Sequence, residues 1–222
     1  MMENFLHPRV TGTSDWATVL FVMALVLIAV TKTVFENRFA EFVKLGISNK
    51  YIKVYRDSSQ LMSWFNVLLF VINLISLSFF IQLILSYFGH ARKDDWILFI
   101  RIFTLVGVFI LAKYLIEKIV AASFNIEEFT DQFNLHKVSY RTYIGLLILP
   151  IDIVLYYNAN TSEVLIFFLI FALLATNVFT YLKSLKIYQN LLMSKMFYFI
   201  LYLCALEIAP YYFMYYWFTK VS

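Results

Sequence analysis

The sequence predicts an all-α fold: a single integral membrane domain over residues 1–222, forming a bundle of six transmembrane helices with amphipathic helices along its cytoplasmic surface. Three observations support this prediction. The chain is 62% hydrophobic and only 14% charged, whereas soluble domains are about half apolar and about a quarter charged. Its apolar residues form long stretches, and its basic residues gather in alternate gaps between them. In water, such stretches would leave very large exposed apolar patches.

Six stretches approach the roughly 20 apolar residues that a membrane-spanning helix needs. They cover residues of about 16–35, 63–88, 96–120, 141–158, 163–182 and 196–217. The second, third and fifth are the clearest, whereas the fourth is short and contains Pro150 and Asp152. Tryptophans lie at span ends, the depth that aromatic rings with a polar edge favour. These are Trp16, Trp64, Trp96 and Trp217.

Lysine and arginine are distributed unequally between the two sides of the predicted bundle. Thirteen of the 18 lie in or beside the gaps that follow the first, third and fifth spans, four lie on the other side, and Arg101 lies within the third span. Because cytoplasmic loops are enriched in Lys and Arg, we expect these gaps to face the cytoplasm and both termini to face outward. Basic segments there would attract anionic lipid head groups. Nucleic-acid binding is not expected, because the basic residues flank apolar spans rather than covering one domain face.

Two of the basic gaps carry an amphipathic pattern. In the first, phenylalanines recur at helical spacing over residues 35–43, and a second basic stretch covers residues 50–56. In the second, Asn125 precedes Glu128 by three residues, as in a capping box. We expect both segments to form interfacial helices along the inner leaflet. The alternative is a solvated loop that extends a spanning helix.

Four of the ionisable residues within the predicted spans are candidate functional residues: Asp152, Glu207, Arg101 and Lys113. Charges inside a membrane helix are costly and usually face the bundle interior. Arg101 and Asp152 lie at similar depths and are expected to pair, whereas Lys113 and Glu117 are spaced for a contact along one helix.

Pro150 and Pro210 lie two and three residues from the two acids and are candidate kink positions, since proline frees a backbone carbonyl. Asp152 and Glu207 therefore either line a polar cavity for a proton, an ion or a lipid head group, or hold helices together. Residues Asn66, Asn73, Gln82 and Asn177 are expected to add weak interhelical hydrogen bonds.

No catalytic or cofactor motif is recognisable in the sequence. It contains no glycine-rich phosphate loop and no H-E-x-x-H zinc motif, and no G-x-S-x-G elbow. We expect no cofactor and no dedicated metal site. Glu127, Glu128 and Asp131 form an acidic cluster that could hold a metal, but such clusters are more often the first turns of a surface helix.

The last predicted span carries a resemblance to a known family. Residues 197–210, FYFILYLCALEIAP, together with the preceding 187–189, resemble the end of domain-of-unknown-function family 4271, multi-pass inner-membrane proteins of Bacteroidota. The overall size and span layout agree across the whole chain. The resemblance implies a bacterial inner membrane and draws attention to Glu207 and Pro210, but it supplies no activity and no substrate.

Three functional hypotheses follow. The first is a non-enzymatic accessory or scaffold subunit of an envelope complex, in contact with the lipid bilayer and a partner protein. It accounts for the missing catalytic signature and the small soluble loops. The alternative is a small transporter or lipid-handling protein with a polar intramembrane cavity around Asp152 and Glu207. A membrane-embedded enzyme acting on a lipid-linked substrate is a third hypothesis.

Overall fold

The structure, a computed structural model, describes residues 15–46, 48, 50–55, 63–89, 91–123, 127–158, 166–176 and 178. Every regular element among these residues is a helix. Four helical segments are long and apolar enough to cross a membrane: Asp15–Val34 (α1), Trp64–Tyr87 (α4), Trp96–Ser123 (α5) and Asn134–Tyr157, which is the larger part of α6 (Glu127–Tyr157). By length and composition the chain is therefore a membrane protein.

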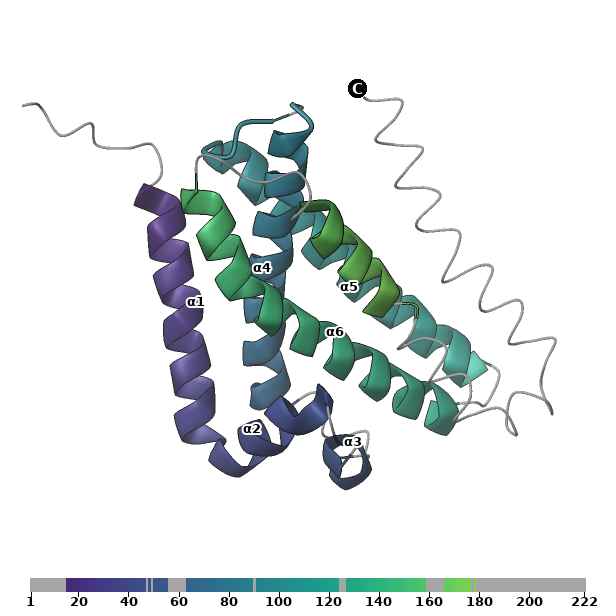
Figure 1. Cartoon of the computed structure of the whole chain (residues 1–222). Coiled ribbons are helices and arrows are strands. Elements are labelled where there is room, and N and C mark those ends of the chain that lie inside the picture. The colour runs from purple at the N-terminus through teal and green to yellow at the C-terminus, as the bar shows by residue number, and fades with distance from the viewer. Residues whose placement is uncertain are drawn as a thin grey trace, which may run out of the picture.

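Helix α4 lies at the centre of the bundle (Figure 1) and packs against α1, α5 and α6. More than half of its most apolar window, 56%, is buried, compared with 22% for α1 and for α5. A helix that is apolar on all sides suits either a protein core or lipid. Helices that are apolar on all sides therefore occur both at the centre of the bundle, as α4, and at its periphery, as α1 and α5.

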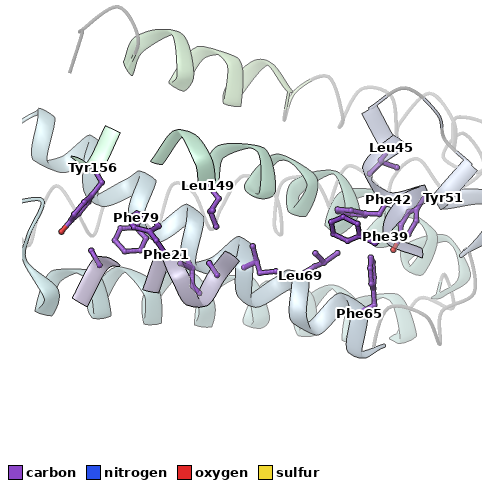
Figure 2. Packing of buried hydrophobic residues seen from close by; sticks show 14 of the residues in the cluster. Phe21, Phe39, Phe42, Leu45, Tyr51, Phe65, Leu69, Phe79, Leu149 and Tyr156 are labelled. Carbon is purple, nitrogen blue, oxygen red and sulfur yellow. The ribbon is translucent and has the colours of Figure 1, made fainter. Parts of the chain in front are cut away.

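Aromatic side chains fill the core at both ends of α4 (Figure 2). At one end Phe79 stacks on Phe21, with ring centroids 4.2 Å apart, and lies 4.5 Å from Phe99. At the other end Phe42 meets Tyr51 and Phe65 edge to face. Ring pairs in these geometries contribute about 0.5–1.5 kcal/mol beyond the area that they bury. The first cluster joins α4 to α1 and α5, and the second joins α4 to the link that precedes it in the chain.

The two ends of the bundle differ in charge. At what we call the opposite end, α1 begins beside the α4–α5 link, since the Trp16 indole N–H donates to the Asp94 carbonyl at 3.3 Å. Thr18 there shares a hydrogen bond with Tyr157 at the end of α6. At what we call the basic end, α1 runs into the link of short helices, and α5 meets the start of α6 through Glu117 and Lys137. Successive long helices thus alternate in direction.

The observed helices agree with the predicted spans at α1, α4 and α5 and differ at α6. The fourth span was predicted to begin at residue 141, but α6 is continuous from Glu127 and its apolar part begins at Asn134. The second amphipathic gap is therefore, in its described part, the first turns of α6 and not a separate interfacial helix. No glycine or proline interrupts residues 127–144, so nothing in the sequence ends the helix there.

The first amphipathic gap does form short helices, Glu36–Val43 (α2) and Lys50–Val54 (α3), joined through a 3₁₀ turn at Lys44–Gly46 (η1). Its apolar face is occupied by protein. Phe39, Phe42 and Leu45 are buried in the same core as α4 and α6. The predicted helical segment is thus present and packs against the bundle, and its position along the inner leaflet stays a prediction.

The fifth predicted span is described in part, as a helix over Ile166–Thr176. The rest of that span and all of the predicted span 196–217 lie outside the described residues.

Candidate functional site

Asp152 is the most deeply buried acid of the described spans. It lies on α6 with 0% of its surface exposed, and Ser76 Oγ of α4 donates a hydrogen bond to its Oδ2 at 3.0 Å. The second carboxyl oxygen, Oδ1, has no hydrogen-bond partner among the described residues. Buried polar groups inside a bundle are stabilised by such interhelical bonds. The Asp152–Ser76 contact therefore ties the two most extensively packed helices together.

One polar side chain and one glycine meet farther along the same α4–α6 contact. Gly145 of α6 lies directly against Asn73 of α4, and a Cβ added at Gly145 would lie 3.0 Å from Asn73 Cγ and 3.3 Å from Asn73 Cα. Small residues at helix crossings allow the backbones to approach closely. Asn73 is 1% exposed, and neither of its amide atoms has a hydrogen-bond partner among the described residues. Its predicted interhelical hydrogen bond is thus replaced by close packing.

A second charged contact joins α5 and α6 near the basic end. Lys137 Nζ donates to Glu117 Oε1 at 2.9 Å, and the exposed fractions of the two side chains are 21% and 2%. Lys113, one turn before Glu117 on α5, is also buried. A buried ion pair is strongly destabilised when one partner is removed, because the other charge stays in a low-dielectric site. The pair therefore fixes the register of α5 against α6.

The link between α1 and α4 is closed by Arg38 of α2. Its guanidinium lies 4.6 Å from the Tyr55 ring centroid and 4.7 Å from that of Phe65. Arginine stacks on aromatic faces because its planar cation is attracted to the negative face of the ring. Beside it, Tyr51 is fully buried, and this burial raises the pKa of its phenol, opposed by the nearby positive charge of Arg38. The neutral phenol is thus the form that fits the folded link.

An exposed ion pair lies on the outer side of the same link. Lys50 Nζ donates to Glu41 Oε1 at 2.9 Å. This hydrogen bond lowers the pKa of Glu41 and raises the pKa of Lys50. Lys50 is exposed and Glu41 is partly exposed, so solvent screens the pair and it contributes little to stability.

At the opposite end, polar groups organise the link between α4 and α5. Gln82 Nε2 donates to the backbone carbonyls of Arg92 and Asp95, at 3.3 and 2.8 Å. Lys93 Nζ donates to the carbonyls of Tyr156 and Asn158, at 3.1 and 3.4 Å. The bonds from Lys93 satisfy carbonyls that the end of α6 leaves without intrahelical partners. Gln82 therefore bonds to the backbone of the α4–α5 link, where an interhelical hydrogen bond was expected.

The remaining predicted residues are not gathered into one site. Arg101 is exposed on α5, and Asp152 is enclosed with Ser76, so the predicted Arg101–Asp152 pair does not form. The two residues match in depth, but Arg101 faces away from the bundle. Pro150 is also exposed, and α6 continues through it. Glu207 and Pro210 lie outside the described residues, and the predicted contact of Lys113 with Glu117 stays a prediction.

The acidic cluster predicted at the start of α6 is described only in part. Glu127 and Glu128 lie in the first turn of α6, and their side chains lie outside the described part of the structure, whereas Asp131 is half-buried. Among the described residues, no group of three or more His, Cys, Asp or Glu side chains is placed to hold a metal ion. The described contacts supply packing and charge pairing between the helices.

Several contacts were not anticipated from the sequence. Ser76, Gly145 and Lys93 were not singled out, although each joins two elements. Ser76 follows Asn73 by three residues and therefore lies on the same face of α4. That spacing was the available signal, but it does not reveal which helix packs against that face.

Comparison with known proteins gives one match. The model of the family described as "Domain of unknown function (DUF4271)" matches residues 17–218. No curated protein and no solved structure matches the chain significantly. The matched range includes every helix described above except the first two residues of α1.

Proposed function

The chain belongs to the DUF4271 family, and from this premise we propose that it is a non-enzymatic integral membrane protein, an accessory or scaffold subunit of an envelope complex. The observation that carries the proposal is the enclosure of Asp152. This acid is 0% exposed and bonded to Ser76. It therefore acts in packing α6 against α4, and the main sequence candidate for a transport or catalytic group already has a structural use.

The proposal extends to location and orientation. The protein lies in the inner membrane of a bacterium, with both termini in the periplasm and the basic end in the cytoplasm. The charge difference between the two ends supports this, because positively charged loops are retained on the cytoplasmic side. Lys44 and Lys50 are exposed at the basic end and are suited to contact anionic lipid head groups.

The experiment combines partner recovery with a stability comparison. Tagged full-length protein is extracted from its native membrane with its surrounding lipid, and its size and composition are measured. We expect a complex larger than the monomer that contains a specific second protein. Asp152→Asn should lower the thermal stability of the protein without changing the composition of the complex formed at low temperature. A monomer without partner would contradict the scaffold proposal.

A transport function predicts a different result. Solute or proton flux into proteoliposomes would then be lost in Asp152→Asn while thermal stability stayed at the wild-type value. Orientation is tested separately in a Cys204→Ala background, by labelling Lys44→Cys and Arg92→Cys with a membrane-impermeant thiol reagent. Labelling of Lys44→Cys from the periplasm would overturn the proposed orientation.

A further inference from the structure

A cavity of about 440 Å³ opens at the opposite end of the bundle. Its apolar lining includes Phe80 and Ile84 of α4, Leu155 of α6, and Ile166 at the start of the last described helix. Its polar lining includes Lys93 and Asp94 of the α4–α5 link. This volume lies in the range of small-molecule sites, about 300–1,000 Å³. The cavity is separate from the buried Asp152–Ser76 contact.

The apolar and polar parts of the cavity are separated along the axis of the bundle. Phe80 and Ile84 lie seven and three residues before Tyr87, where α4 ends, which places them about 5–10 Å inside the helix end. Lys93 and Asp94 lie beyond that end, in the link. Trp16 and Trp96 pack together at the same end, and tryptophans favour the depth of the membrane interface. The apolar part therefore lies at the depth of the acyl chains and the polar part at that of the head groups.

The polar rim carries charges of both signs. An ammonium group has three N–H donors, and Lys93 uses two of them on the Tyr156 and Asn158 carbonyls. Arg92 and Asp94 form a bidentate ion pair, with contacts of 3.2 and 3.0 Å, in which the arginine side chain is 81% exposed and the aspartate side chain 21%. A guanidinium has five N–H donors and a carboxylate about four acceptor sites, so the intact pair can bind a phosphate through Arg92 and an ammonium through Asp94. A basic and an acidic group side by side match a head group that itself carries a phosphate and an amine.

The dimensions and position argue against other occupants. A helix with its side chains is about 10–12 Å across. The cavity would therefore hold only about one helical turn, which is too short to be the docking site of a transmembrane helix. A purely anionic lipid would meet the Asp94 carboxylate on the same rim. A small polar solute would gain no binding energy from the apolar part of the lining, which lies at the depth of the acyl chains.

We propose that this cavity binds a glycerophospholipid with a phosphoethanolamine head group. Lys93 and Arg92 bind the phosphate, Asp94 accepts hydrogen bonds from the ammonium, and an acyl chain lies along Phe80, Ile84, Leu155 and Ile166. This binding site adds a specific lipid ligand to the proposed scaffold function and does not depend on it.

The test measures lipid binding to the purified full-length protein by native mass spectrometry. Phosphatidylethanolamine and phosphatidylglycerol with the same acyl chains compete for the protein in mixed micelles. We expect phosphatidylethanolamine to bind preferentially. Lys93→Gln should weaken its binding about tenfold, the effect of losing one charge-assisted hydrogen bond. Ile84→Trp, which fills the apolar part, should weaken it at least as much.

A matched control accompanies these variants. Ile97→Trp adds a ring to an exposed position of α5 at the same end as the cavity. It should not change binding. Equal loss in Ile97→Trp would identify the lipid as part of the general lipid shell and overturn the proposal. So would wild-type affinity in a folded Ile84→Trp, and equal binding of phosphatidylglycerol would overturn the head-group assignment. The lipid competition uses the wild-type protein and decides the head group even if a variant does not fold.

Discussion

Substitution of Gly145 by alanine probes a close approach of α6 to α4. The added Cβ would overlap Asn73 Oδ1 and would lie 3.3 Å from Asn73 Cα, an atom of the α4 backbone. A flexible side chain could turn aside, but the approach to the backbone requires the two helices to separate. Overpacking of this kind costs about 1–3 kcal/mol. Alanine gains up to about 1 kcal/mol over glycine in a helix interior, so we expect a net loss of about 0–2 kcal/mol.

Gly107 provides the matched control, because it also lies in a helix that packs against α4. A Cβ at Gly107 would meet Leu74 Cδ1 at 3.6 Å, an ordinary van der Waals separation. Gly107→Ala should therefore be neutral or stabilising, since it gains helix propensity without a clash. The two variants should differ in free energy of unfolding by about 1–3 kcal/mol, the cost of the clash alone.

The assay is reversible unfolding of the purified protein in bicelles, followed by helical circular dichroism. Asn73→Ala is combined with Gly145→Ala, because it removes Oδ1 and Cγ and leaves only the crowding against the α4 backbone. The double variant should recover part of the loss, with a coupling energy of about 0.5–3 kcal/mol. Equal stability of Gly145→Ala and Gly107→Ala, together with no coupling to Asn73, would refute the α4–α6 packing described above.

Three further predictions concern the charged contacts. Glu117→Gln should destabilise the protein by about 2–3 kcal/mol in the same unfolding assay. This is less than the roughly 3–5 kcal/mol for breaking a fully buried pair, because Lys137 is partly exposed. The double variant Glu117→Gln, Lys137→Met should recover most of that loss. Arg38→Lys should lower the free energy of unfolding by about 1 kcal/mol, because an ammonium cannot stack on Tyr55 and Phe65 as a guanidinium does. The control is Arg92→Lys, at a largely exposed arginine, which should change stability less. Burial in the folded state raises the pKa of Tyr51 above its ordinary value of 10.0. The neutral phenol therefore contributes its full stabilisation below about pH 10 and loses it as the pH rises above that value. The wild type should lose stability between about pH 10 and 12 more steeply than Tyr51→Phe, and parallel stability curves would contradict the burial of this phenol.

The sequence predicted the spans α1, α4 and α5 closely, because apolar length and flanking tryptophans depend on local composition alone. It also identified Asp152 as an unusual buried acid. It did not predict the partner of Asp152, because depth along the membrane normal is only one of two coordinates. The second is the angle around the helix, which depends on which neighbours pack where. Ile102 is buried while the adjacent Arg101 is exposed, so the step of about 100° between consecutive helix residues is enough to turn a side chain from the bundle interior to its surface.

The distribution of polar groups in the described bundle bears on where a partner would be recognised. Asn73, Ser76 and Asp152 lie inside, between helices. The outer faces of α1 and α5 consist largely of exposed valine, leucine and isoleucine, with Lys32, Arg101 and Lys118 as exposed charged residues. An apolar surface within lipid offers little specificity, because lipid chains compete for it on equal terms. Recognition of a partner is therefore expected at the two ends, where the link around Arg38 and the link around Lys93 present polar groups at interface depth. Cross-links from photoreactive residues placed at Lys44 or Arg92 should therefore reach the partner in higher yield than those placed at Val26 or Val108, and the reverse ranking would place recognition within the membrane.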